Sequence, residues 1–189
     1  MKKSSFFIVA AAVQSLFLAA GAANLPGTLS EDGKTYWIDG RHLPLEGRAF
    51  PDAELPYQRI PDRIKAMTNV NYGVWVQGQC SAGMLFRFNI KKSNLLKVRW
   101  SVKYEHLAGG NMSPSVKSGV DFYGWDPKRG EWRFQNCAKP KKKDGNEQLL
   151  WVPGSGDVML YLPCYNGTTK FEIGVVPTAE ITPISRRRR

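Results

Sequence analysis

The most reactive stretch of the chain runs from Gly78 to Gly83, where Cys80 and Ser81 stand between glycines. A nucleophile elbow holds such a side chain on a sharp turn between a strand and a helix. The residues after Gly83 alternate as a strand instead, and Gln79 occupies the place where a Gly-x-Ser-x-Gly elbow requires glycine. We therefore predict that neither side chain is a nucleophile.

Other catalytic and metal-binding arrangements are also missing from the sequence. His42 and His106 are the only histidines, and nothing in the sequence pairs either of them with a serine as a catalytic triad requires. There is no Cys-x-x-Cys pair and no closely spaced pair of histidines to indicate a metal site. We predict no catalytic residue, no metal and no cofactor in this chain.

Asp121 stands among glycines and aromatic rings in residues 117–126. A glycosidase needs two opposed carboxylates, but Asp121 and Asp126 fall on opposite faces of an unbroken strand. The favoured interpretation is structural: Asp121 hydrogen-bonds to backbone or to an arginine such as Arg87 or Arg99. The alternative is a contact with a ligand or with another domain.

Several aromatic side chains near Asp121 could form a sugar-binding surface. Aromatic rings offer flat apolar faces, and amides beside them exchange hydrogen bonds with hydroxyl groups. The candidates for contact with a glycan or a second domain are Tyr123, Trp125, Trp132, Tyr165 and Asn166. The alternative is that rings at period 2 belong to the core, which is the interpretation favoured for Phe122.

These residues must be positioned by β-strands, because period-2 alternation dominates the chain after its N-terminal segment. In residues 84–90 and 96–104 every second residue is apolar, which is typical of antiparallel strands with one solvated face. Residues 91–94 are predicted to join these two strands as a hairpin. Further strands are expected at residues 36–39, 71–77, 120–125, 131–134, 148–152, 158–163 and 170–176.

About ten short strands in a single domain predict an all-β fold, a jelly-roll-like antiparallel β-sandwich. Residues 61–67 could form one helical turn, and no other stretch after the N-terminal segment has a helical period. Residues 43–62 and 107–116 are the predicted long loops.

The N-terminal segment has the order of a secretory signal peptide: two lysines, an apolar run over residues 6–20, and small residues. The alternative is an uncleaved membrane anchor, for which the apolar run is short. We predict a signal peptide at residues 1–23, one domain at 24–183 and a basic tail at 184–189. The mature protein is then secreted or periplasmic, without a lipid anchor and without membrane contact.

Three cysteines, Cys80, Cys137 and Cys164, are an odd number for an oxidising compartment. A disulfide between Cys137 and Cys164 would contribute about 3–4 kcal/mol through loop entropy. Cys80, at the start of a strand pattern, is predicted to be a small buried residue. The sequence leaves the pairing open.

The positive charge of the chain is concentrated in three short segments. The net charge is +11, and ten of the lysines and arginines lie in residues 2–3, 139–143 and 186–189, so the remainder is at +1. A nucleic-acid-binding protein would spread its cations over a face together with stacking aromatic rings. We predict no nucleic-acid partner.

Seven stretches of the chain, in this order, resemble one family. They are YWIDGRHLPLEGRAF (36–50), YQRIP (57–61), SAGMLFRF (81–88), KVRW (97–100), GVDFY (119–123), LYLPCYNG (160–167) and FEIGV (171–175). Over roughly residues 35–176 the chain resembles the N-terminal GxDLY domain of secreted SGNH/GDSL-type esterases. The namesake motif falls on Gly119, Asp121 and Tyr123, with Phe122 in place of the usual leucine.

The resemblance implies a jelly-roll domain that precedes an SGNH-type hydrolase domain acting on carbohydrate or related esters. The family's catalytic serine belongs to that following domain, in a Gly-Thr-Ser or Gly-Asp-Ser block, and no such block occurs here. We expect a non-catalytic accessory domain whose partner is the hydrolase domain, and interpret the basic tail as a truncated linker. The alternatives are a stand-alone carbohydrate-binding module and, least favoured, an intact enzyme with unrecognised chemistry.

Overall fold

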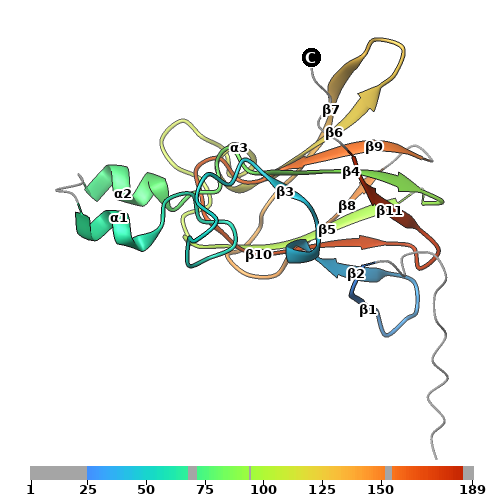
Figure 1. Ribbon diagram of the computed structural model, residues 1–189, viewed down its shortest axis with the longest axis horizontal. Helices are drawn as coiled ribbons and strands as arrows, with labels where there is room; N and C mark the ends of the chain where they lie inside the picture. The colour runs from blue at the N-terminus through green and yellow to red at the C-terminus, as the bar shows by residue number, and fades with distance from the viewer. Residues whose placement is uncertain (1–24, 68–71, 94, 152–154, 185–189) are drawn as a thin grey trace, which may run out of the picture.

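The computed structural model describes residues 25–67, 72–93, 95–151 and 155–184, which form two antiparallel sheets face to face (Figure 1). Sheet A has the strand order β1 (Gly27–Leu29), β2 (Tyr36–Asp39), β10 (Thr168–Val175), β5 (Leu95–Val102), β8 (Asn146–Trp151). Sheet B has the order β11 (Glu180–Pro183), β4 (Leu85–Lys91), β9 (Gly156–Tyr161), β6 (Val120–Asp126), β7 (Glu131–Ala138), and β3 (Leu45–Glu46) also pairs with β4. The predicted all-β sandwich is confirmed. The predicted signal peptide, and the predicted tail apart from residue 184, lie outside the described residues.

The core lies between the two sheets and follows the alternation of the strands. Phe86, Phe88 and Ile90 of β4 have no exposed surface, and neither have Val98 and Trp100 of β5. Because β4 belongs to sheet B and β5 to sheet A, these apolar faces meet across the sandwich. Burying large apolar side chains in this way stabilises the fold by about 1.5–3 kcal/mol for each of them.

The hairpin expected at residues 91–94 is wrong. β4 pairs with β3, β9 and β11, whereas β5 pairs with β8 and β10. The chain therefore crosses from sheet B to sheet A between Lys91 and Leu95. Alternation determines which side chains face the core. It does not show whether two consecutive strands pair in one sheet or lie in opposite sheets, because the alternation is the same in both cases.

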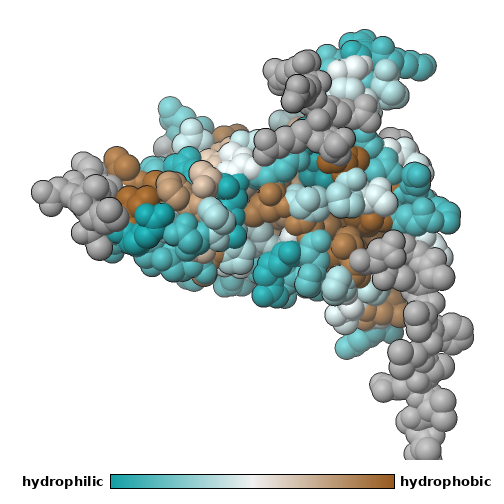
Figure 2. All heavy atoms as spheres, viewed as in Figure 1, coloured by the Kyte–Doolittle hydropathy of each residue, from teal (hydrophilic) through white to brown (hydrophobic). Residues whose placement is uncertain are grey.

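The strand expected at residues 71–77 is also wrong, because these residues form helix α2 (Tyr72–Gly78). It follows α1 (Asp62–Met67), where one helical turn is expected. The Ile60 N–H donates to the Gly78 carbonyl at 3.0 Å, and a Cβ on Gly78 would lie 2.6 Å from the Ile60 side chain. This contact holds the end of α2 against the segment before α1. A short apolar run fits a strand or a buried helix equally well, which is why alternation gave the wrong element. Figure 2 shows hydrophobic residues over these helices, at one end of the molecule.

Two short helices and one hairpin position the polar residues of the sandwich. The loop predicted at residues 43–62 follows the 3₁₀ turn η1 (Gly40–His42) and contains β3 and the first residue of α1. The loop predicted at 107–116 is wrong in its last three residues, which begin the helix α3 (Pro114–Ser118). β6 and β7 form a hairpin that stands out from the body of the sandwich (Figure 1). Its turn contains Gly130 with φ of 68°, a conformation that glycine adopts without strain.

Candidate functional site

The outer face of sheet B carries the polar residues of the Gly119–Tyr123 stretch. Because Val120 and Phe122 of β6 are buried, Asp121 and Tyr123 point to the opposite side of the sheet. One outward row across the sheet consists of Leu85, Tyr161, Asp121 and Cys137. The next row consists of Arg87, Met159, Tyr123 and Phe134. We call these eight residues the Asp121 face.

The Asp121 face is unusually apolar for the outside of a sheet. Its residues are partly buried, except for Phe134, which is 58% exposed. The rings of Tyr123 and Phe134 meet edge to face, with 5.6 Å between their centroids. Exposed aromatic rings on a surface of partly buried neighbours are typical of protein interfaces.

Asp121 lies beside thiol and phenol groups rather than beside a cation. Burial, followed by a hydrogen bond with Asp121, raises the pKa of the Cys137 thiol to about 12. Burial is also the main cause of the raised pKa of Tyr123, and the Asp121 charge is the next cause. Both groups therefore keep their protons at neutral pH and are available as hydrogen-bond donors.

The arginine partner expected for Asp121 is wrong. Arg87 lies on the same face but pairs with Glu46: its Nε donates to Oε1 at 2.7 Å, and its Nη2 donates to Oε2. Arg99 belongs to the other sheet and its Nη2 donates to Glu147 at 2.8 Å. Other carboxylates lie on both outer faces of the sandwich, so Arg87 pairs with Glu46 and Arg99 with Glu147 instead of with Asp121.

The surroundings of Gly119 explain why this position is a glycine. It ends α3, with its N–H donating to the Ser115 carbonyl at 3.0 Å, and it leads directly into β6. A Cβ at this position would lie 2.3 Å from the Ser115 oxygen, 2.7 Å from the Cys137 sulfur and 2.8 Å from the Ala138 oxygen. Only glycine lets the helix end this close to the edge strand β7.

Three of the predicted aromatic candidates, Tyr123, Trp125 and Trp132, share one face of the β6–β7 hairpin, whereas Tyr165 lies elsewhere. Trp125 and Trp132 pair edge to face on the hairpin, with centroids 5.4 Å apart. Tyr123 belongs to the Asp121 face, next to this pair. Tyr165 is 46% exposed and lies near the start of β6, where its N–H donates to the Lys117 carbonyl at 3.1 Å.

Asn166 is a buried structural residue, which corrects its expected contact with a glycan or second domain. It has no exposed surface. Its amide oxygen accepts from the Tyr104 N–H, and its amide nitrogen donates to the Tyr104 carbonyl and to the Ser118 hydroxyl, each at 3.0 Å. The amide thus joins the loop after β5 to the end of α3 and is not accessible to a ligand.

The expected disulfide between Cys137 and Cys164 is absent from the structure, in which Cys80, Cys137 and Cys164 are free thiols. Cys137 lies on β7 and Cys164 follows β9, and β6 separates these two strands in the sheet. Cys80 is buried at 2% exposure, as expected.

The residues with the most suggestive chemistry are not arranged for catalysis. Ser81 is fully buried, and its hydroxyl donates to the Tyr57 carbonyl at 2.9 Å and accepts from the Thr168 N–H at 2.8 Å. His42 and His106 are both exposed. Within the part of the chain that the structure describes, no cluster of His, Cys, Asp or Glu side chains could hold a metal ion.

A small hollow of about 260 Å³ lies beside the β6–β7 hairpin. Its lining includes two aromatic residues, two carboxylates, an amide and a guanidinium, from Phe122, Trp125, Asp126, Asp157, Gln135 and Arg133. We call it the hairpin hollow. Only Trp125 among these is a candidate from the sequence, because polar residues on strands carry no pattern that separates a pocket lining from a solvated face.

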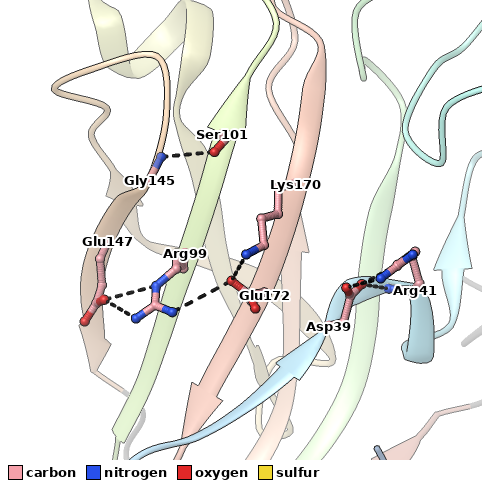
Figure 3. Close-up of polar contacts among 8 residues, drawn as sticks. All are labelled: Asp39, Arg41, Arg99, Ser101, Gly145, Glu147, Lys170 and Glu172. Carbon is pink, nitrogen blue, oxygen red and sulfur yellow. Dashed lines mark hydrogen bonds and ion pairs between the residues drawn. The ribbon is translucent and has the colours of Figure 1, made fainter. Parts of the chain in front are cut away.

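The outer face of sheet A is different in character, because it is an ionic network (Figure 3). Arg99 lies between Glu147 and Glu172 and stacks over the Trp37 ring, with its guanidinium 3.8 Å from the ring centroid. Lys170 approaches Glu172 at 3.2 Å. The charges on this face therefore have partners in the same sheet.

Comparisons with known proteins agree on the fold. The family described as GxDLY, N-terminus of Esterase_SGNH_hydro-type, matches residues 35–181. The chain resembles the structure of a Bacteroides ovatus protein described as a GDSL-like lipase, with a TM-score of 0.69 and 24% identity, covering 82% of this chain and 44% of that one. It also resembles the salicylyl-acyltransferase SsfX3 from a tetracycline biosynthetic pathway, with a TM-score of 0.56 and 14% identity, covering 82% and 43%. Among curated proteins none matches the sequence significantly.

The chain thus spans less than half the length of these two proteins. Among the described helices, none has the length and apolar character needed to cross a membrane.

Proposed function

The chain belongs to the GxDLY family, the N-terminus of SGNH-hydrolase-type esterases, and we propose that it is the non-catalytic domain that packs against the hydrolase domain. The observation that carries the proposal is the Asp121 face. It combines an exposed aromatic ring, partly buried apolar side chains and an unneutralised carboxylate, whereas the outer face of sheet A is filled with ion pairs. Of the two faces, the Asp121 face is the one suited to burial against a partner.

The position of the last strand, β11, also indicates that the partner domain lies on the side of sheet B. β11 is the edge strand of sheet B and runs beside β4, where Pro183 is level with Phe88. A domain joined after residue 184 therefore begins beside sheet B. More than half of each structural neighbour lies outside the part that matches this chain.

The contacts of such an interface can be assigned from the chemistry of the face. Phe134 is the best candidate for an anchor, since exposed aromatic rings contribute much of the binding energy in interfaces. Asp121 accepts hydrogen bonds from the partner, and Tyr123 donates one. Ser81 is buried and hydrogen-bonded, and the sequence contains no Gly-Thr-Ser or Gly-Asp-Ser block, so we assign the hydrolytic chemistry to the partner domain.

A binding experiment with matched variants tests this role. The nucleotide sequence downstream of the arginine codons is read in all frames for a Gly-Thr-Ser or Gly-Asp-Ser block, and the encoded hydrolase domain is expressed separately. Its affinity for the chain is measured by calorimetry. Phe134→Ser is expected to weaken binding at least about tenfold.

The control is Leu149→Ser on the outer face of sheet A, where Leu149 is 56% exposed, close to the 58% of Phe134. This variant is expected to bind as the wild type does. Equal losses for both variants, or no binding by the wild-type chain, would contradict docking through the Asp121 face. Separately, the isolated chain is expected not to hydrolyse p-nitrophenyl acetate faster than a heat-treated control.

The second candidate function is carbohydrate binding, which the hairpin hollow favours. Trp125 lines it together with residues that carry carboxylate and amide groups, a combination that suits a hydroxylated ring. A glycan array with the purified chain tests this role. Retention that Trp125→Ala abolishes and Phe134→Ser preserves supports a glycan site, and absence of retention on any glycan contradicts it.

We also propose that the protein is exported, on the basis of residues 1–23, which lie outside the described residues. N-terminal sequencing of the protein from the medium or periplasm is expected to give a start at residue 23 or 24. An intact N-terminal methionine on the mature protein would contradict export by signal cleavage.

A further inference from the structure

A further pocket lies on the side of the molecule formed by η1 and the loop at residues 48–57. It has a volume of about 300 Å³, and a second hollow of about 370 Å³ shares Arg41, Pro56 and Tyr57 with it. Part of the first pocket is an apolar wall made of Leu43, Leu45, Ala53 and Pro56. We call the first of these hollows the Tyr57 pocket. None of its lining residues belongs to the Asp121 face or to the hairpin hollow.

Two hydrogen-bond donors of the pocket lining have no partner. The Tyr57 side chain is 2% exposed, and its hydroxyl makes no hydrogen bond. The Nε of Arg48 is also buried without a partner, although Nη2 of the same guanidinium donates to the Ala53 carbonyl at 2.8 Å. Unpartnered buried donors are rare in folded proteins and indicate a missing acceptor.

The hydroxyl of Tyr57 is held in position as a donor. Its ring contacts those of Phe86 and Phe171 edge to face, with centroids 6.1 and 6.5 Å away. Gly40 admits the hydroxyl at the pocket wall, because a Cβ on Gly40 would lie 2.5 Å from the oxygen. Burial raises the pKa of Tyr57 above its usual value, so the phenol keeps its proton.

Of the other charged residues in the lining, Arg41 is ion-paired and Glu54 is hydrogen-bonded. Arg41 binds Asp39, with Nη2 2.8 Å from Oδ2. Glu54 accepts from the Asp62 N–H at 2.9 Å. Within the described residues, Arg48 is the cation of this pocket that has no carboxylate at ion-pair distance.

We propose that the Tyr57 pocket binds a small organic carboxylate. Its oxygens accept hydrogen bonds from Arg48 and from the Tyr57 hydroxyl, and its hydrocarbon part lies against the apolar wall. A guanidinium and a carboxylate match in charge and in planar geometry. Both donors belong to residues of the lining. The Tyr57 ring is held by its contacts with Phe86 and Phe171, whereas the Arg48 side chain is only partly buried and turns to meet the ligand.

The experiment is a titration of the purified, isotope-labelled chain with sodium butyrate, followed by NMR. Sodium chloride at equal ionic strength and neutral butyramide are the reference ligands. Butyrate is expected to produce saturable shifts in residues 40–57 and in the Arg48 Nε–H signal. Acetate is expected to bind more weakly, by up to about fourfold for each methylene that no longer contacts the wall.

Variants separate this site from general anion binding. Arg48→Gln is expected to weaken butyrate binding at least about tenfold, because it removes a charge-assisted hydrogen bond. Tyr57→Phe is expected to weaken it about threefold or more while leaving the fold intact, because the lost hydroxyl had no partner. Arg129→Gln is the control, since Arg129 lies in the hairpin turn with its side chain 65% exposed.

The proposal is overturned if butyrate shifts no resonance beyond those that chloride shifts, or if butyramide binds equally well. Unchanged butyrate affinity in Arg48→Gln overturns it too. If Arg48→Gln does not fold, the wild-type titration decides: an Arg48 Nε–H signal that stays in place at saturating butyrate excludes the site.

Discussion

Replacing Gly119 by alanine tests whether the first residue of the Gly-x-Asp-Phe-Tyr stretch is needed for space. The added Cβ would lie within 3 Å of the Ser115 and Ala138 carbonyl oxygens and of the Cys137 sulfur. The two oxygens belong to the backbone and cannot turn away as a side chain can. Relief therefore requires α3 to move away from β7, which breaks the Gly119 N–H to Ser115 hydrogen bond.

The expected cost follows from these contacts. Overfilling a close-packed site costs about 1–3 kcal/mol, and loss of one hydrogen bond adds about 1 kcal/mol. Alanine in place of glycine restricts the unfolded chain, which returns about 0.4–1 kcal/mol. The net loss in the free energy of unfolding should be about 1–3 kcal/mol.

Urea unfolding followed by tryptophan fluorescence measures this loss. With a slope of about 2 kcal/mol per molar urea, the midpoint should fall by about 0.5–1.5 M. The matched control is Gly156→Ala at the start of β9, where a Cβ would meet nothing within 4 Å. That variant should equal or exceed the wild type in stability.

The result that would refute the reasoning is a Gly119→Ala midpoint within error of the wild type. Equal destabilisation by Gly119→Ala and Gly156→Ala would refute it as well, because it would show that backbone freedom rather than space decides. A changed slope would instead show that the substitution alters the compactness of one state.

Three further predictions concern buried polar groups. Asn166→Ala should lower the free energy of unfolding by about 2–4 kcal/mol, because the Tyr104 N–H, the Tyr104 carbonyl and the Ser118 hydroxyl each lose a hydrogen bond. The control Asn111→Ala, at an exposed position, should change it by less than about 0.5 kcal/mol. The pKa of the Cys137 thiol is raised to about 12 in the folded chain, so the unfolded chain loses this proton at a lower pH. The free energy of unfolding should therefore fall as the pH rises from 9 towards 12. In urea unfolding, Cys137→Val should show a weaker decline. Arg87→Met should lower the free energy of unfolding, measured with heat or urea, by about 3 kcal/mol, because the partly buried Glu46 loses the Arg87 cation. The double variant Arg87→Met, Glu46→Leu should recover most of that loss.

Local alternation was sufficient to predict the faces of the strands, since residues such as Phe86, Phe88 and Trp100 are buried as their positions indicate. It was not sufficient to predict which strands pair. β4 and β5 are consecutive and equally amphipathic, yet they face each other across the core. Pairing depends on contacts between distant segments, such as Phe86 of β4 stacked on Phe171 of β10 at 5.0 Å, and no short stretch of sequence encodes them.

The candidate sites were less predictable than the fold for a related reason. Asn166 has the same side chain whether it binds a sugar or bridges two loops, and only its burial distinguishes the two roles. Arg48 and Tyr57 lie in two of the stretches that resemble the family, 36–50 and 57–61, but those stretches assign neither residue a role. Their importance depends on which hydrogen bonds the folded chain leaves unmade. Unsatisfied donors are a property of the tertiary structure, so sequence patterns do not reveal them.

The alternation of β6 separates two kinds of requirement within the Gly-x-Asp-Phe-Tyr stretch. Val120 and Phe122 face the core, where any apolar side chain of suitable volume serves, and Phe122 fills the position of the usual leucine at 1% exposure. Gly119, Asp121 and Tyr123 follow at period 2 on the other side. Gly119 is required by the close approach of α3. Asp121 has no ion pair among the described residues, and its neighbours are the Cys137 thiol, which hydrogen-bonds with it, and the Tyr123 phenol. Because a partly buried carboxylate without a cation can accept hydrogen bonds from a partner, Asp121 is included in the proposed interface.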